Sequence, residues 1–258
     1  AGKVQMTGGG TNSAGALAVS SGQAMTLSNT SLISRGAATL NSQDTLTVNG
    51  GGVSAQGGAL TVAGGQGVAL SDATLTGQGD TTLSTGGSLT QRGGSVTGRG
   101  ALSVAAGKDI TLTNTRSGSD TRATLSSGGT LSSTGSAVSA GESLALSGGQ
   151  LVLDGQSRAD AAADIRLTGS TVSNQGQVNA GRDIALSGDR VSSSGLLAAM
   201  DRGQSALLLR AAKARGVVTS FDLIAPNENT LELLRPLLPS VDYFMPSLEE
   251  ASYLSGRT

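Results

Sequence analysis

The sequence predicts a mainly β protein: residues 1–196 form a parallel β-helix, and residues 197–258 form a short α/β segment. One observation is a regular spacing of aliphatic side chains, which recur every 21 residues, and once after 22. A second is apolar–polar alternation over short stretches of each repeat. A third is composition, because every proline and every aromatic residue lies after residue 220. The regularly spaced residues are Val19, Leu40, Val62, Leu83, Val104, Leu125, Leu146 and Leu167.

Each repeat contains about three short strands that are separated by corners of Gly, Asn, Asp and Ser. Leu102 and Val104 alternate with polar residues, as do Ile110 and Leu112, which is the period-2 pattern of a half-buried strand. An Ala-Gly-Lys-Asp turn joins these two strands, and its glycine supplies backbone angles that other residues resist. A further apolar position marks the third strand in many repeats: Leu32, Val53, Leu75, Val96, Val138 and Val172.

Such a coil cannot bury a core alone, so the sequence predicts a stack of coils. Coils about 4.8 Å apart pair as parallel strands, and their inward Leu, Val and Ile side chains form columns along the axis. Nine coil starts, from Gly15 to Gly181, give a rod about 40 Å long. Proline is missing because it would remove a ladder hydrogen bond. A disordered linker rich in Gly, Ser and Thr is the alternative, but linkers do not keep aliphatic residues in register.

Composition limits the chemistry of the chain. Without Cys and His, it has no disulfide, no thiolate and no Ser-His or Cys-His pair. Residues 1–196 carry 11 basic and 11 acidic side chains, and residues 197–258 carry 6 and 7. Neither part has the basic excess expected for nucleic acid or an anionic membrane. No apolar run could span a bilayer, and the first residues do not resemble a signal peptide. We therefore expect no nucleic-acid partner, no membrane insertion and no cofactor.

Three segments resemble the haemagglutinin repeats of filamentous-haemagglutinin-type exoproteins: residues 58–65 (GALTVAGG), 106–113 (AGKDITLT) and 180–187 (AGRDIALS). The resemblance extends over residues 1–196. It implies a right-handed β-helix, exported by two-partner secretion and displayed on Gram-negative bacteria as an adhesin or a toxin stalk. The implied location is secreted or cell-surface, and the implied partner is a host-cell glycan or receptor. The family's secretion domain and an Arg-Gly-Asp triplet are not recognisable in the sequence.

Beyond residue 196, helix and strand signals alternate, which is an α/β pattern. One helix candidate ends at Gly216, as helices commonly do. Another begins at Ser247, which with Glu250 forms a capping-box sequence. The expected helices are at 205–216, 231–238 and 247–254, and the expected strands are at 217–222 and 241–246.

The segments 211–222 (AAKARGVVTSFD) and 241–256 (VDYFMPSLEEASYLSG) resemble the middle of a ribokinase-like (carbohydrate kinase) sequence. The resemblance implies that Asp222 is a strand-end aspartate and that Glu250 is the glutamate of an Asn-x-x-Glu motif, which organises Mg²⁺ around nucleotide phosphates. Ser247 stands where that motif has its asparagine. The family's sugar-binding and nucleotide-binding halves are missing. We therefore expect both acidic residues to be non-functional here, without a metal or cofactor site.

The densest acidic group consists of Asp154, Asp160 and Asp164, with Arg158 and Arg166 among them. A β-helix enzyme that acts on polysaccharide needs two carboxylates about 5–9 Å apart. The spacings of 6 and 4 residues spread these aspartates around a corner of the coil instead of along one strand face. We favour a structural interpretation, in which these residues form a solvated corner without catalytic residues.

Three glycine-rich motifs are interpreted as coil corners. Gly77-Gln-Gly-Asp80 resembles the Gly-Ala-Gly-Asp anion hole of the kinases, but it precedes the kinase-like segment and falls where other coils also have corners. Gly8–Gly10 and Gly50–Gly52 precede no helix that could present its N-terminal dipole to a phosphate.

Taken together, these patterns favour a non-catalytic structural or adhesive stalk segment, fused to a non-functional kinase-like fragment. The alternatives are a polysaccharide-acting β-helix enzyme, an inactive carbohydrate kinase fragment, and a chimera without native function that arose by engineering, gene fusion or a reading-frame error. Exposed coil edges predict end-to-end self-association. An apolar face around Leu207, Leu208 and Leu209 is predicted to cap the coil near Ile184 and Leu186.

Overall fold

The structure, a computed structural model, forms two compact units, Ala1–Ala199 and Met200–Thr258. The predicted boundary after residue 196 falls inside the last strand of the first unit, which continues to Ala199. No helix among the described residues is long and apolar enough to cross a membrane. The described residues are 2–199, 209–210, 212–216, 218–221, 234–235 and 237–255.

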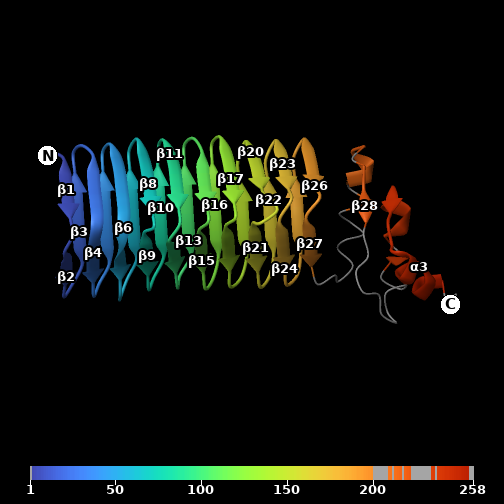
Figure 1. Ribbon diagram of the computed structural model, residues 1–258, viewed down its shortest axis with the longest axis horizontal. Coiled ribbons are helices and arrows are strands. Elements are labelled where there is room, and N and C mark those ends of the chain that lie inside the picture. Colours follow the sequence, from blue (N-terminus) through green and yellow to red (C-terminus); the bar gives the residue numbers. More distant parts are fainter. Residues whose placement is uncertain are drawn as a thin grey trace. The chain divides into compact units, whose positions relative to one another are not determined.

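The first unit is a parallel β-solenoid of about nine turns with about 21 residues per coil, which confirms the predicted fold class (Figure 1). Each coil adds one strand to a nine-stranded sheet, and the remaining strands form an eighteen-stranded sheet. The nine-stranded sheet contains β3 (Leu17–Ser21), β5 (Ala38–Ser42), β7 (Leu60–Gly64), β10 (Thr81–Thr85), β13 (Leu102–Ala106), β16 (Ala123–Ser127), β19 (Leu144–Ser147), β22 (Ile165–Thr168) and β25 (Ile184–Ser187).

The eighteen-stranded sheet covers the other two sides of the coil. Two of its strands, β4 and β6, run through the corner between those sides without a break, and this joins both sides into one sheet. Its strands are β1 (Val4–Thr7), β2 (Gly10–Ser13), β4 (Met25–Ser34), β6 (Thr45–Ala55), β8 (Gly67–Ser71), β9 (Thr74–Gly77), β11 (Ser88–Arg92), β12 (Ser95–Gly98), β14 (Ile110–Thr113), β15 (Arg116–Ser119), β17 (Thr130–Thr134), β18 (Ala137–Ala140), β20 (Gln150–Leu153), β21 (Arg158–Ala161), β23 (Thr171–Asn174), β24 (Gln177–Ala180), β26 (Arg190–Ser193) and β27 (Leu196–Ala199).

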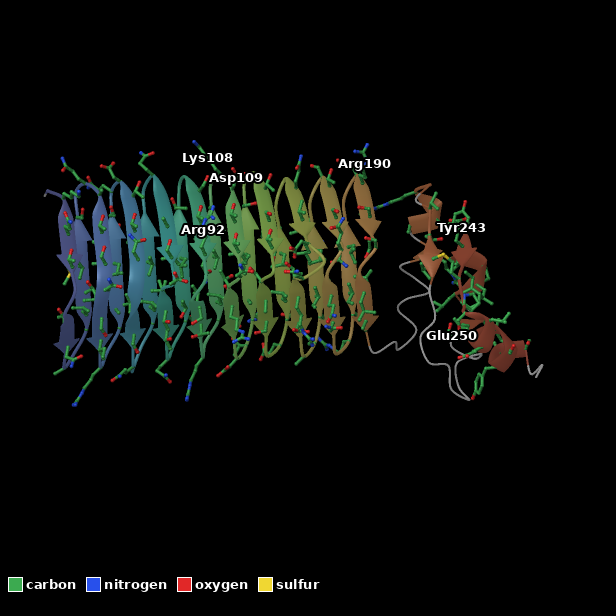
Figure 2. The ribbon with its side chains drawn as sticks, viewed as in Figure 1. Arg92, Lys108, Asp109, Arg190, Tyr243 and Glu250 are labelled. Atoms are coloured by element: carbon green, nitrogen blue, oxygen red, sulfur yellow. The ribbon has the colours of Figure 1, made fainter. Side chains whose placement is uncertain are left out.

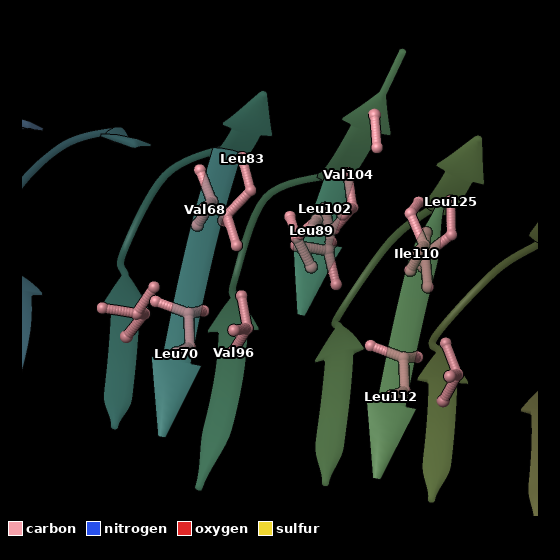
Figure 3. Close-up of a cluster of buried hydrophobic side chains, with 14 of the residues drawn as sticks. Val68, Leu70, Leu83, Leu89, Val96, Leu102, Val104, Ile110, Leu112 and Leu125 are labelled. Atoms are coloured by element: carbon pink, nitrogen blue, oxygen red, sulfur yellow. The ribbon is translucent and has the colours of Figure 1, made fainter. Parts of the chain in front are cut away.

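The aliphatic residues that define the sequence repeat stand directly above one another. Val19 pairs with Leu40, and Leu40 pairs with Val62. The column continues through the other predicted members and ends at Leu186. Figure 3 shows part of the core, with inward Leu, Val and Ile side chains from successive coils. Burial of one such side chain contributes about 1.5–3 kcal/mol, and the contribution repeats in every coil.

One corner of the coil, between the two sides of the eighteen-stranded sheet, carries a left-handed residue on seven successive coils; we call it the left-handed corner. Only Gly, Asn and Asp occupy it, because they tolerate positive φ better than other residues do. Glycine alternates with Asn or Asp because a Cβ on Gly50 would overlap Asn29 Oδ1, and a Cβ on Gly93 would overlap Asp72 Oδ1. The residues and their φ angles are Gly8 66°, Asn29 50°, Gly50 65°, Asp72 50°, Gly93 62°, Asn114 53° and Gly135 58°.

The second unit contains the predicted α/β elements in shorter form. Strand β28 (Ser220–Phe221) pairs in parallel with β29 (Tyr243–Phe244), as expected for strands at 217–222 and 241–246. Helix α3 (Leu248–Ser255) begins one residue after the predicted start. The backbone is also helical at 209–210 and 212–214. Leu234 and Leu237 form a small core with Leu209, Phe244 and Leu254.

Two predictions for this unit are changed or not covered. Where a helix was expected at 231–238, Leu234 is helical, and a 3₁₀ turn, η1 (Leu238–Ser240), takes the end of this range, because Pro239 cannot continue an α-helix. Residues 231–233 and 236 lie outside the described residues. So do Leu207 and Leu208, on which the capping prediction depends.

Candidate functional site

A shallow, open groove of about 580 Å³ runs along the solenoid, at the end of the nine-stranded sheet. Its floor is one register position on five successive coils, where each outward residue pairs with the next: Asn41, Ala63, Ser84, Ala105 and Ser126. At about 4.8 Å per coil, this floor extends roughly 19 Å along the axis. The other lining residues are Ser42, Gln43, Gly64, Gly65, Thr85, Gly86, Ala106 and Gly107.

Small side chains make the groove. Gly64 and Gly65 have no room for a Cβ, because one would overlap Gly67 O and Gln43 O respectively. The backbone therefore approaches its neighbours closely at this corner, and no large side chain rises from it. Lys108, next to Gly107 of the groove, extends outward from the corner, as does Arg190 four coils further along (Figure 2). The described groove residues carry no ionisable side chain, but they do offer neutral hydroxyl and amide groups.

A row of hydroxyl side chains lies beside the groove, on the outward face of the same sheet. Register pairs connect these residues through five coils: Thr39, Thr61, Thr82, Ser103 and Thr124. The groove floor and this row are two residues apart on each strand, so both point away from the core. Together they form a flat, uncharged polar surface, which we call the hydroxyl face.

The acidic group singled out in the sequence is dispersed over the coil, as its spacing predicts. Asp154 lies at the corner after β20, Asp160 lies within β21, and Asp164 lies at the corner before β22. Asp160 accepts hydrogen bonds from Arg158 Nε at 2.5 Å and from Asn179 Nδ2 at 2.8 Å. Asp164 pairs with Arg182 at 2.6 Å. Each carboxylate thus interacts with partners at its own corner or strand.

Asp154 holds together a four-residue turn. Burial acts to raise the pKa of Asp154, but hydrogen bonds from the Ser157 side chain and from the backbone of Gly135, Gln156 and Ser157 outweigh it and leave the pKa below 3.8. The Ser157 hydroxyl donates to Oδ1 at 2.6 Å, and the Gly135 N–H donates at 3.0 Å. Because Gly135 belongs to the preceding coil, the carboxylate also connects two coils.

The glycine motifs are corners, as predicted. Asp80 Oδ1 accepts a hydrogen bond from the Ala101 N–H of the next coil at 2.8 Å, so the aspartate of Gly77-Gln-Gly-Asp80 stabilises coil stacking. Gly8–Gly10 begins with two residues of positive φ, between β1 and β2. Gly50–Gly52 lies in β6, where the first two residues also have positive φ and turn the strand.

Glu250, the candidate Mg²⁺-organising residue, takes part in a capping box. Its Oε2 accepts a hydrogen bond from the Ser247 N–H at 2.7 Å, and the Ser247 hydroxyl accepts one from the Glu250 N–H at 3.3 Å. This reciprocal pair fixes the start of α3. Asp222, the other candidate, lies outside the described residues. In the part of the chain that is described, no group of three or more His, Cys, Asp or Glu side chains is placed to hold a metal ion.

A second polar cluster in the second unit was not predicted from the sequence. Asp242 accepts hydrogen bonds from the Thr219 N–H at 2.9 Å and hydroxyl at 3.0 Å, and it pairs with Lys213 at 3.1 Å. These contacts, the Thr219 backbone first, hold the pKa of Asp242 below its ordinary value. The cluster ties the residue before β29 to the segment before β28, so its role is to align the two strands.

Comparison with known proteins adds no identity: no protein-family model, no curated protein and no solved structure matches this chain. The two family resemblances drawn from the sequence therefore stay predictions. What defines the chain is its class of fold, a parallel β-solenoid with a groove and a flat hydroxyl face. Sequence reasoning missed the groove, although the small residues at one register position of five coils were a signal for it.

Proposed function

We propose that residues 1–199 act as a non-catalytic structural and adhesive stalk, which binds an uncharged glycan along the hydroxyl face and its groove. The observation that carries this proposal is the shape and chemistry of the groove: it is open, crosses five coils, and is lined by uncharged residues, in which Ala and Gly alternate with residues that carry hydroxyl or amide groups. An extended polymer suits such a site because the same register position recurs about every 4.8 Å along it. The resemblance to haemagglutinin repeats adds the expectation of a secreted or cell-surface location and a host-cell ligand.

The lack of charge in the groove favours a neutral ligand. Hydroxyl and amide groups both donate and accept hydrogen bonds, so they match sugar hydroxyls without a counter-charge. An acidic polysaccharide would find no cation among the described lining residues. Catalysis of glycan cleavage is the less favoured function, because none of the described groove-lining residues carries a carboxylate.

Binding of the full chain to a glycan array tests this proposal. We expect retention of neutral glycans without cleavage, and loss of retention in Ala105→Arg, which places a long charged side chain on the groove floor. Thr134→Arg is the matched control, because Thr134 is also exposed but lies at the end of β17, in the other sheet. Shortened glycan products would support the enzyme alternative. Equal binding by both variants would rule out the groove as the site.

The kinase-like segment is proposed to be inactive. Its one described candidate, Glu250, is engaged by Ser247 in the capping box of α3. Incubation with ATP, Mg²⁺ and a panel of sugars should give no phosphorylated product. Phosphoryl transfer that is lost in Glu250→Gln would reverse this assignment.

End-to-end self-association of the stalk is a further part of the proposal. Among the described residues, β27 pairs with β24 alone, and Leu196 and Leu197 on it are 40% and 38% exposed. An unpaired strand edge with exposed leucines favours the addition of another strand. Light scattering should show mass rising with concentration, and Leu196→Lys with Leu197→Lys should abolish the rise. A mass that stays monomeric over the whole range would refute self-association.

A further inference from the structure

The described interior of the solenoid contains two buried side-chain amides, Gln91 and Asn174, and Gln91 has aliphatic neighbours on both sides. Gln91 is 2% exposed, and it stands between Leu70 and Leu112 in register. Leu27 and Val48 occupy the same position in earlier coils. A buried amide must form hydrogen bonds to offset the loss of its hydration. Both the nitrogen and the oxygen of the Gln91 amide therefore need hydrogen-bond partners inside the solenoid.

One polar atom of the Gln91 amide has no hydrogen-bond partner among the described residues. The Ser117 hydroxyl donates to Gln91 Oε1 at 3.3 Å, whereas Nε2 is fully buried and has no partner among the described residues. Exchange of the two amide atoms does not remove the problem. In that orientation Nε2 would donate to Ser117, and the oxygen would lack a donor. Either way the protein satisfies half of this amide.

The neighbouring coil adds a second unpaired group, two residues before Ser117, whose hydroxyl contacts Gln91. Thr115 lies three residues beyond Leu112, the register partner of Gln91, and its Oγ1 is also buried without a partner among the described residues. Ser117 stands in a column where its neighbours are Val96 and Val138. A serine is smaller than a valine, so it fills less of the interior at this position than either neighbour does.

The chemistry of these groups defines what would complete them. An amide N–H needs an acceptor, and a threonine hydroxyl accepts or donates. Neither a metal cation nor an anion has a charge partner among these three side chains. A small, neutral molecule that accepts and donates hydrogen bonds would satisfy the Gln91 amide and the Thr115 hydroxyl together. We propose that a water molecule binds inside the solenoid, between the coils that carry Gln91 and Thr115, and connects the two by hydrogen bonds.

This internal water site is independent of glycan binding, and a crystal structure of the full chain at a resolution that shows ordered water tests it. We expect a solvent peak within hydrogen-bond distance of both the Gln91 amide and the Thr115 hydroxyl. Gln91→Met, an unbranched apolar replacement of similar volume, should remove the peak. Thr90→Val is the control: its side chain points outward from the same strand, and the peak should persist.

Oxygen-17 relaxation dispersion provides a second measurement in solution, because it counts internal waters that exchange slowly. Gln91→Met should lose one such water relative to the natural sequence, and Thr90→Val should lose none. A well-ordered core without solvent beside Gln91, or an equal count in Gln91→Met and the natural sequence, would overturn the proposal. Ser117→Val with Gln91→Met replaces both partners and keeps the test open if the single variant folds poorly.

Discussion

Replacement of Gly93 by alanine tests the left-handed corner, and its cost can be worked out from two parts. The φ of Gly93 is 62°, and an alanine in the left-handed region costs about 1–2 kcal/mol. The new Cβ would also overlap Asp72 Oδ1 of the preceding coil, and overpacking of this kind costs about 1–3 kcal/mol. We expect Gly93→Ala to lower the free energy of unfolding by about 2–5 kcal/mol.

Chemical denaturation followed by circular dichroism at the sheet band measures this loss. Gly155→Ala is the matched control, because its φ is outside the left-handed region and the nearest atom to its Cβ, Gln175 O, lies at 3.8 Å. That change should be neutral or stabilise by about 0.4–1 kcal/mol. Asp72→Gly combined with Gly93→Ala should recover the part caused by overlap. If Gly93→Ala and Gly155→Ala unfold alike, the reasoning about this corner is refuted.

Three further predictions concern single side chains. Leu40→Ala should destabilise the solenoid by about 2–5 kcal/mol, because Leu40 is 0% exposed in the central column; denaturation that shows a loss below about 1 kcal/mol would contradict that column. Asp154 has a lowered pKa, so it binds its proton less readily in the folded state than in the unfolded state: the stability it contributes is present above pH 3.8 and is lost as the pH falls further. Asp154→Asn should reduce the loss of stability at acid pH, which is measured as the melting temperature over a pH series. An unchanged pH dependence would show that the Asp154 carboxylate does not stabilise the turn. Ser247→Ala should weaken α3 by about 0.5–2 kcal/mol, visible as faster amide exchange in its first turn; equal exchange would show that the capping box contributes nothing.

The repeat could be predicted because it depends on period alone. Any residue that recurs at the coil length must stand on its counterpart, so the column from Val19 to Leu167 followed from the spacing. The capping box of Ser247 and Glu250 was equally local, since both partners lie within four residues. Parallel pairing of β28 with β29 followed from the helix and strand alternation.

Other features depend on contacts between the side chains and backbones of neighbouring coils, and the length of the sequence repeat does not define these contacts. The alternation at the left-handed corner arises because the side chain of Asn29 takes the space above Gly50. Gln91 looked like an ordinary strand residue, since its inward position became clear only from its pairing with Leu70. The groove likewise depends on backbone approach at the corners. Asp222, one of the two kinase-like candidates, lies outside the described residues.

Unequal coils share the same columns. Leu40 and Val62 are 22 residues apart, whereas Leu167 and Leu186 are 19 apart, and both pairs are in direct register. The difference is absorbed at corners such as the turn held by Asp154, so the columns stay in register. Whole coils could thus be duplicated or removed by recombination at any corner, and each event would change the reach of the rod by about 4.8 Å without a new core having to evolve.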